Sequence, residues 1–206
     1  VYTRDSGDME IQGKAYGNLT PKQAQAAGVA IIHQELNMCR HLTVAENMFL
    51  GREKVRGMVL SQREMEDEAA EVLGRLKIDI SPRTVVGDLP ISKQQMVEIA
   101  KAFGSNAWIV VMDEPTSAIT EADKENLFKI IRELKENNIA VVYISHRMSE
   151  IFEIADEITI LRDGRQVIAG PVSEFDENKV IRHMVGRELN DIFTREKGAP
   201  GEEVLR

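Results

Sequence analysis

Two adjacent carboxylates, Asp113 and Glu114, follow a run of apolar residues near the middle of the chain. The run, 108–112, is short and rich in β-branched residues, which is typical of a strand buried on both faces of a parallel sheet. Acids at the carboxyl end of such a strand lie where open α/β sheets bind ligands. One carboxylate can hold a metal-bound water while the other polarises an attacking water. The alternative is that two acids simply end a strand and begin a loop.

Two further predicted strands end close to polar residues. Val29–Ile32 is followed by Gln34, and Ile139–Ile144 by His146. The carboxyl ends of parallel strands share one edge of a sheet, so Gln34, the Asp113–Glu114 pair and His146 are expected to converge on one ligand. Taken singly, Gln34 would more often be a loop residue and His146 a surface histidine at a strand end.

The elements that position these residues are indicated by helix-start signals. Thr43–Glu46 and Ser61–Glu64 match the capping-box pattern, and Ser92–Gln95 is interpreted in the same way. Thr120 is expected to cap a long amphipathic helix. Between 52 and 103 the pattern favours helices and loops with no convincing strand, which predicts a helical subdomain inserted into an α/β core.

The predicted organisation is a single partial domain. Its α/β core comprises 1–51 and 104–186, and the helical subdomain with a signature-like helix comprises 52–103. Asp163 and Gly164 form the expected turn of a hairpin. The charged tail 187–206, with its glycines and a proline, resembles a linker.

Composition narrows the class of protein. Of 206 residues, 43% are hydrophobic and 29% charged, which fits a soluble protein with a substantial core, and the net charge of −8 argues against nucleic acid as a partner. Cys39 is the only cysteine, so an internal disulfide is impossible and a reducing cytoplasm is the expected setting. The four histidines are scattered, and no run of about 18 apolar residues occurs.

Taken in order, these motifs resemble the ATP-binding subunit of ABC transporters, and most closely the first nucleotide-binding domain of the monosaccharide importers of the ribose, galactose and xylose type. The resemblance implies a P-loop NTPase core, a mostly parallel sheet flanked by helices, with an inserted helical subdomain. The corresponding segments are the Q-loop strand at Val29–Leu36, the signature and its helix at Leu89–Ala100, Walker B at Ile109–Glu114, the D-loop at Pro115–Thr120 and the switch-histidine strand at Val141–His146.

The resemblance also implies roles and cofactors, namely ATP and Mg²⁺. Asp113 would hold Mg²⁺ through water, and Gln34 would contact the metal and the attacking water. Glu114 would be the general base for hydrolysis of the γ-phosphate, and His146 would contact that phosphate. Ser117, in the D-loop, would be a nucleotide-binding residue.

One departure from the family pattern is the phosphate-binding loop. No Gly-x-x-x-x-Gly-Lys-Ser/Thr occurs; Gly13 and Lys14 are followed by Ala15, with Asp8 in the place of the first glycine. That loop supplies backbone N–H groups and a lysine to the phosphates. We expect that the N-terminal part of the core is missing by truncation, and that the chain alone binds ATP poorly or not at all.

The other departure is the signature, where the family's Leu-Ser-Gly-Gly-Gln is replaced by a sequence with a proline in second place. This segment would contact nucleotide across a dimer, and its loosened form predicts a weakened half-site. Alternatively, Ser92 only caps a helix and Lys93 is a solvated charge. The candidate residues here are Pro90, Ile91, Ser92, Lys93 and Gln94.

The function implied is an ATPase that powers import of a monosaccharide, bound peripherally at the cytoplasmic face of the cell membrane. Its partners would be a second nucleotide-binding domain, membrane permease subunits docked near 52–86, and indirectly a sugar-binding protein, with no nucleic acid. The alternative is a non-hydrolytic ABC-like dimerisation or regulatory module. A DNA-repair or translation ATPase would be expected to carry long coiled-coil insertions or basic arms, whereas the helical insertion here is short.

Overall fold

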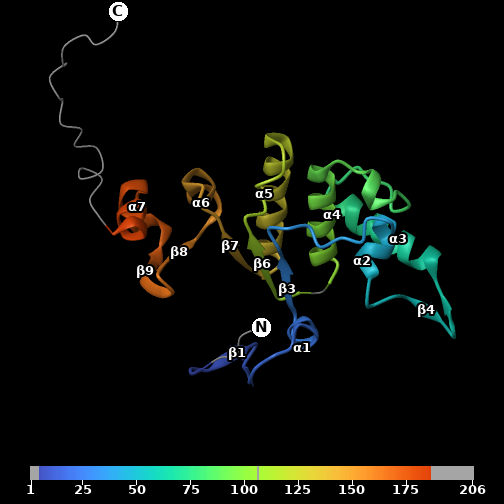
Figure 1. Cartoon of the computed structure of the whole chain (residues 1–206), viewed down its shortest axis with the longest axis horizontal. Helices are drawn as coiled ribbons and strands as arrows, with labels where there is room; N and C mark the ends of the chain where they lie inside the picture. Colours follow the sequence, from blue (N-terminus) through green and yellow to red (C-terminus); the bar gives the residue numbers. More distant parts are fainter. Residues whose placement is uncertain (1–4, 106, 187–206) are drawn as a thin grey trace, which may run out of the picture. The chain divides into compact units, whose positions relative to one another are not determined.

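The computed structural model describes residues 5–105 and 107–186 (Figure 1). Contacts within the chain define two compact units, Val1–Ile154 and Ala155–Arg206. The elements of the first unit are β1 (Met9–Ile11), β2 (Lys14–Tyr16), α1 (Pro21–Ala26), β3 (Val29–Ile32), α2 (Val44–Phe49), β4 (Val55–Arg56), β5 (Val59–Leu60), α3 (Gln62–Arg75), a 3₁₀ turn (Val86–Asp88), α4 (Ile91–Phe103), β6 (Ile109–Asp113), α5 (Glu121–Glu136), β7 (Ala140–Ile144) and α6 (Met148–Ile154).

A three-stranded sheet in the order β3-β6-β7 forms the centre of the first unit. All three strands are parallel, with Val29 paired to Ile109 and Ile109 paired to Ala140. Their carboxyl ends therefore lie at one edge, as the sequence predicts. The crossovers between them contain α4 and α5, the arrangement that parallel strands require.

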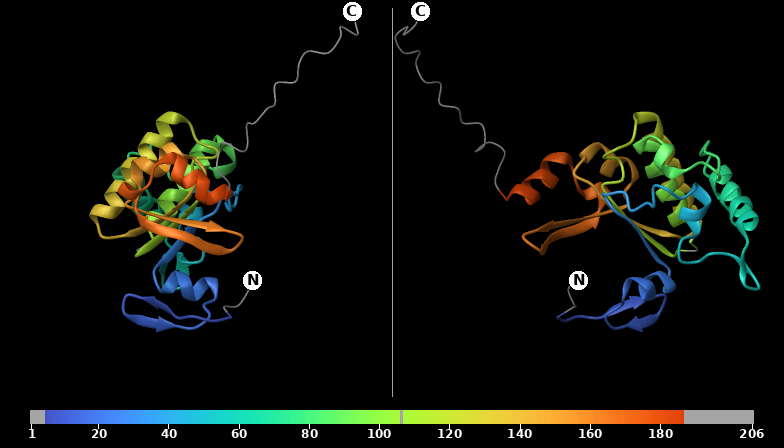
Figure 2. Two further views of the ribbon diagram at one scale, coloured as in Figure 1. Left: turned by 90° about the vertical axis from the view of Figure 1, so that its left-hand side faces the viewer. Right: turned by 45° about the vertical axis from the view of Figure 1, so that its right-hand side comes forward.

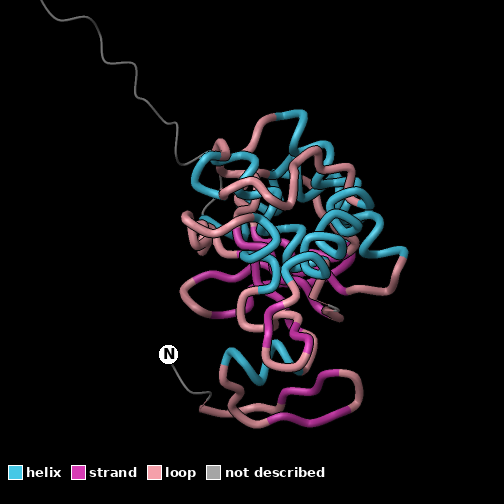
Figure 3. The backbone as a smooth tube through the Cα atoms, turned by 90° about the vertical axis from the view of Figure 1, so that its right-hand side faces the viewer, coloured by secondary structure: helices cyan, strands magenta, loops and turns pink. Residues whose placement is uncertain are grey.

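Only one face of this sheet is fully buried. Ile32, Val110 and Met112 are at most 1% exposed and belong to the apolar core that α4 and α5 also supply. Figure 3 draws the backbone with the helices in cyan and the strands in magenta. On the opposite face Ile31 is 50% exposed and Val142 nearly as much. Successive strand residues alternate between the two faces, and α4 and α5 pack against the same one. The prediction of strands buried on both faces is therefore wrong for this structure.

A short hairpin interrupts the region predicted to hold only helices and loops. Strands β4 and β5 pair antiparallel around Gly57, whose φ of 66° is readily accessible to glycine. Each strand has only two residues, too few to produce a recognisable alternation of polar and apolar positions. Figure 2 shows this hairpin in teal, next to α3. The expectation of no strand between 52 and 103 is thus corrected.

The helix starts follow the capping signals in two places and depart from them in two. The Thr43 hydroxyl and Glu46 form the expected capping box at α2, and Thr120 accepts a hydrogen bond from the Asp123 N–H at α5. Ser61 precedes α3 without a side-chain cap bond, and the Glu64 carboxylate accepts a hydrogen bond from Arg56 at 3.4 Å in place of the Ser61 N–H. The predicted capping box at that position is wrong.

Helix α4 begins two residues earlier than predicted. Pro90 precedes it as the N-cap residue and Ile91 is its first residue, so Ser92 lies inside the first turn. A proline suits the start of a helix because its φ is already fixed near the helical value and its missing N–H needs no partner there. The prediction that Ser92 caps this helix is therefore wrong.

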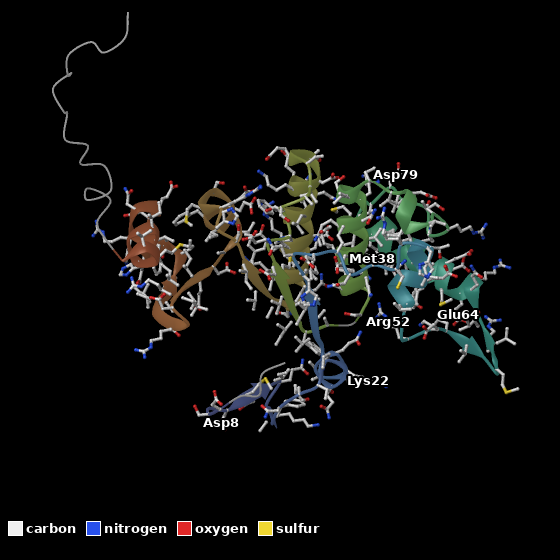
Figure 4. The ribbon with its side chains drawn as sticks, in the orientation of Figure 1. Asp8, Lys22, Met38, Arg52, Glu64 and Asp79 are labelled. Atoms are coloured by element: carbon white, nitrogen blue, oxygen red, sulfur yellow. The ribbon has the colours of Figure 1, made fainter. Side chains whose placement is uncertain are left out.

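The helical region of the first unit packs α2 and α3 against α4. Arg52, labelled in Figure 4, follows α2 and donates hydrogen bonds to the carbonyls of Met48, Lys101 and Gly104 at 2.8–3.2 Å. Burial lowers the pKa of this guanidinium, which Glu68 partly offsets. One arginine side chain thus links the end of α2 to the end of α4 and holds these two helices together.

The second unit contains β8 (Glu157–Arg162), β9 (Arg165–Pro171), a 3₁₀ turn (Val172–Glu174) and α7 (Glu177–Val185). Strands β8 and β9 pair as the predicted hairpin, with Asp163 and Gly164 both at positive φ in the turn, which confirms the Asp-Gly signal. The predicted linker 187–206 lies outside the described residues. The division of the core from the helical subdomain stays a prediction.

Candidate functional site

The three polar positions singled out in the sequence meet at the carboxyl edge of the sheet. Gln34 lies two residues beyond β3, Glu114 directly follows β6, and His146 lies two residues beyond β7. Glu114 is the centre of the group: its Oε1 is 2.9 Å from His146 Nδ1, and its Oε2 accepts a hydrogen bond from Gln34 Nε2 at 3.3 Å. Gln34, Glu114 and His146 therefore converge as expected, whereas Asp113 makes no hydrogen bond with them in the described part of the chain.

The backbone of Glu114 is held in an uncommon conformation. Its φ is 45°, a left-handed value that costs a non-glycine residue free energy and that clusters at functional sites. Its N–H donates to the Ile144 carbonyl at 2.9 Å, and its carbonyl accepts from the Ser117 N–H at 3.1 Å. The neighbouring strand and the following turn therefore fix the direction of the carboxylate.

The exposures of the two partners differ. The Glu114 side chain is 28% exposed, whereas the His146 side chain is 68% exposed. The carboxylate therefore has less freedom than the imidazole, which can reach a ligand from the solvent side. This arrangement suits a carboxylate that polarises a water and a histidine that contacts an anion above it.

Asp113 is the last residue of β6 and pairs in register with Ile144. Within residues 5–105 and 107–186 its partly buried carboxylate has no hydrogen-bond or ion-pair partner. The same described part of the chain contains no group of three or more His, Cys, Asp or Glu that could hold a metal by itself. The donor set fits a cation that keeps waters and takes further oxygens from a ligand, as Mg²⁺ does.

The sequence of this chain matches known proteins along its length. The family model described as ABC transporter matches residues 1–117, more than half of the chain. The chain belongs to the ABC transporter family. At 46% identity over the whole chain it is similar to the galactose/methyl galactoside import ATP-binding proteins MglA of Salmonella typhimurium and Escherichia coli K12, and it spans 40% of the length of each.

Solved ABC structures agree with the fold. A nucleotide-free ATP-binding cassette from an ABC transporter superposes with a TM-score of 0.73 at 21% identity, covering 90% of this chain and 76% of that one. A dimeric cassette in a post-hydrolysis state with ADP and phosphate gives a TM-score of 0.70 at 22% identity, covering 83% and 75%. The fold is therefore that of an ABC cassette, mixed α/β with a parallel sheet.

The segment resembling the ABC signature makes its own contacts at the start of α4. Gln94 is buried and donates to the Leu89 carbonyl at 2.8 Å, while Lys93 forms a 3.8 Å ion pair with Asp123 of α5. Ile91 is exposed. In the described part of the chain, no hydrogen bond or ion pair links Pro90, Ile91, Ser92, Lys93 or Gln94 to Gln34, Glu114 or His146. Ser117 is exposed, and its N–H donates to the Glu114 carbonyl.

One polar residue near the site, Glu150, was not predicted from the sequence. Glu150 of α6 is 2% exposed and accepts hydrogen bonds from Thr116, Tyr143 and Ser145. Burial and the bond to Glu150 both raise the pKa of the Tyr143 hydroxyl. The place of Glu150 in the first turn of α6, which starts two residues after His146, is the signal that could have found it.

Proposed function

We propose that this chain is the part of an ATP-hydrolysing import subunit that carries the hydrolytic residues. The observation behind this proposal is the carboxylate of Glu114 held between Gln34 and His146 at the carboxyl edge of the sheet. Glu114 accepts the proton of the attacking water, and His146 binds the terminal phosphate and stabilises its charge. ATP bound with Mg²⁺ supplies the phosphoryl group.

The metal side of the site is assigned to Asp113 and Gln34. The Asp113 carboxylate has no other partner in the described part of the chain. Gln34 uses its amide nitrogen on Glu114, so its amide oxygen is available to a cation or a water. We assign Pro90, Ile91, Ser92, Lys93, Gln94 and Ser117 to nucleotide contacts that form across a pair of nucleotide-binding domains.

The phosphate-binding loop is proposed to lie in a part of the full-length protein beyond these 206 residues. Three features support this: the loop's sequence pattern is absent here, the chain spans 40% of its curated relatives, and the sheet has an apolar face with Ile31 and Val142 about half exposed. Burying such a face stabilises a fold by about 25 cal/mol per Å². The family resemblance and the exposure of Ile31 and Val142 together support placing the phosphate-binding loop outside these residues.

The transported substrate is proposed to be a monosaccharide, galactose or a methyl galactoside in the first instance, because the relatives at 46% identity carry that name. The subunit would work at the cytoplasmic face of the membrane with permease subunits that dock near 52–86, a second nucleotide-binding domain and, indirectly, a sugar-binding protein. None of the helices in the described ranges is long and apolar enough to cross a bilayer. The permease subunits would form the path of the sugar across the membrane.

The test is Glu114→Gln in the full-length protein that contains this chain. Loss of a general base lowers ATP turnover by about 10²- to 10⁴-fold while ATP binding persists, and uptake of labelled galactose in cells falls with it. Glu121→Gln is the matched control, since Glu121 lies at the exposed start of α5 and, within the described residues, forms an ion pair with Lys124. ATP binding without turnover in the unmodified protein would instead support the non-hydrolytic dimerisation or regulatory module.

A further inference from the structure

Glu150 of α6 is a deeply buried carboxylate near the site, with 2% of its surface exposed. Its Oε2 accepts three hydrogen bonds: from Tyr143 OH at 2.8 Å, Thr116 Oγ1 at 2.9 Å and Ser145 Oγ at 3.2 Å. Its Oε1 is 3.3 Å from Arg147 Nη1. Burying a carboxylate costs free energy unless hydrogen bonds compensate for the lost water. The four side chains that bond to Glu150 are therefore held in fixed positions around it.

The partners of Glu150 come from the two segments that carry the catalytic pair. Thr116 is two residues after Glu114, in the turn that the Ser117 N–H closes on the Glu114 carbonyl. Ser145 and Arg147 stand on either side of His146, and the Ser145 hydroxyl also accepts from the Arg147 N–H at 3.0 Å. One carboxylate therefore joins the loop after β6 to the loop after β7.

We propose that Glu150 is a positioning residue that sets the distance between the Glu114 carboxylate and the His146 imidazole. Within the described residues no hydrogen bond or ion pair joins Glu150 to either of them. The Glu150 Oε2 atom accepts hydrogen bonds from both Thr116, two residues after Glu114, and Ser145, which directly precedes His146; we call this shared acceptor the clamp. The Glu114 Oε1 and His146 Nδ1 atoms are 2.9 Å apart. The paired register of β6 and β7 ends at Asp113 and Ile144, and the Glu114 N–H still donates to the Ile144 carbonyl. Thr116, Ser145 and His146 lie beyond that last bond, where Glu150 supplies a further link between the two segments.

This inference rests on the proposed ATPase function, yet it makes a claim about geometry that is independent of turnover. Moving a reacting group by about 1 Å can lower a rate about 100-fold. Replacing the Glu150 carboxylate by an amide directs an N–H₂ group at either Arg147 or the three hydroxyls. The clamp then loosens while the polar shape of the side chain is kept.

The experiment compares Glu150→Gln with Glu153→Gln in the full-length protein. Glu153 is on the same helix, is half exposed and forms an ion pair with Arg132 at 2.9 Å, so it controls for loss of an α6 charge pair. For Glu150→Gln we expect kcat for ATP to fall about 10-fold with KM changed less than about 2-fold. We also expect the ¹⁵N resonance of His146 Nδ1 to shift toward that of an imidazole without its Glu114 partner. Glu153→Gln should change neither.

A second pair of variants separates positioning from simple destabilisation. Thr116→Val keeps the side-chain shape and removes the donor to Glu150, and it should reproduce both effects, whereas Thr116→Ser should restore most of the turnover. A lowered unfolding temperature with an unchanged His146 resonance and an unchanged kcat would overturn the proposal. If the unmodified protein hydrolyses no ATP, the proposed function fails, and the His146 resonance in Glu150→Gln alone decides the positioning role.

Discussion

Replacing Glu98 by glutamine is expected to stabilise this domain at neutral and alkaline pH. Glu98 lies on α4, is 7% exposed, and its Oε2 has no hydrogen-bond partner within the described residues. Burial raises the pKa of this carboxyl more than the Asn37 N–H, Lys101 and His33 lower it. The folded chain therefore binds the Glu98 proton more tightly than the unfolded chain does.

The sign of the pH dependence follows from that difference. Tighter proton binding by Glu98 in the folded state adds to the free energy of unfolding. This contribution is fully present below the ordinary glutamate pKa of about 4.3, and it is lost as the pH rises through the raised pKa of the folded state. A buried polar group left unpaired costs about 1–3 kcal/mol. Glutamine removes the buried charge and keeps the acceptor for Asn37, but it adds an unpaired N–H₂ group that offsets part of the benefit. We therefore expect the free energy of unfolding to rise by about 1 kcal/mol at pH 8, equivalent to about 2–4 °C in unfolding temperature.

Urea unfolding at pH 8, 6 and 4 measures this effect. The advantage of Glu98→Gln should shrink steadily toward pH 4, where the wild-type carboxyl is already protonated. Glu125→Gln, at an exposed position of α5, serves as the control and should show no such trend. A stability difference that is the same at pH 4 and pH 8, or a variant less stable at pH 8, would refute the reasoning.

Two further predictions concern the helical framework and use the same unfolding measurement. Thr120→Ala removes the side-chain cap of α5 and should cost about 1 kcal/mol, whereas Ser61→Ala removes no cap bond and should cost only a few tenths; equal losses would contradict the assigned caps. Arg52→Lys breaks the forked contacts to backbone carbonyls, among them Gly104, and should cost about 2 kcal/mol, while Arg63→Lys on the exposed face of α3 should be neutral. A neutral Arg52→Lys would show that water replaces those bonds.

The parallel sheet and its ligand edge were predictable because they depend on local patterns. Short apolar runs at 29–32, 108–112 and 139–144 match three strands of the structure to within one residue at each end. Parallel pairing then places their polar successors together without any knowledge of loops. Gln34, Glu114 and His146 could be grouped for that reason, and their contacts at 2.9 and 3.3 Å agree with the grouping.

What the sequence could not predict depends on competition between partners distant in the chain. Glu64 satisfies the capping-box pattern, yet Arg56 of the hairpin takes its carboxylate. The burial of Glu150 arises from Thr116, 34 positions earlier in the chain, as well as from nearby Tyr143. Burial of the sheet on one face only is likewise a property of which helices pack where. Periodicity reports what a segment can do alone, and these features are set by tertiary contacts.

The polar groups at the sheet edge fall into two kinds: those that already have hydrogen-bond partners within the protein and those that do not. The Glu114 carboxylate and its strained backbone, and the Glu150 carboxylate behind it, are held by contacts from both neighbouring loops. The Asp113 carboxylate has no such partner in the described part of the chain, and Gln34 offers its amide oxygen. A satisfied group costs no reorganisation when a ligand arrives, which suits a base that must already point at its water. An unsatisfied carboxylate gains most from a cation, so ligand binding should change the surroundings of Asp113 and leave Glu114 where it is.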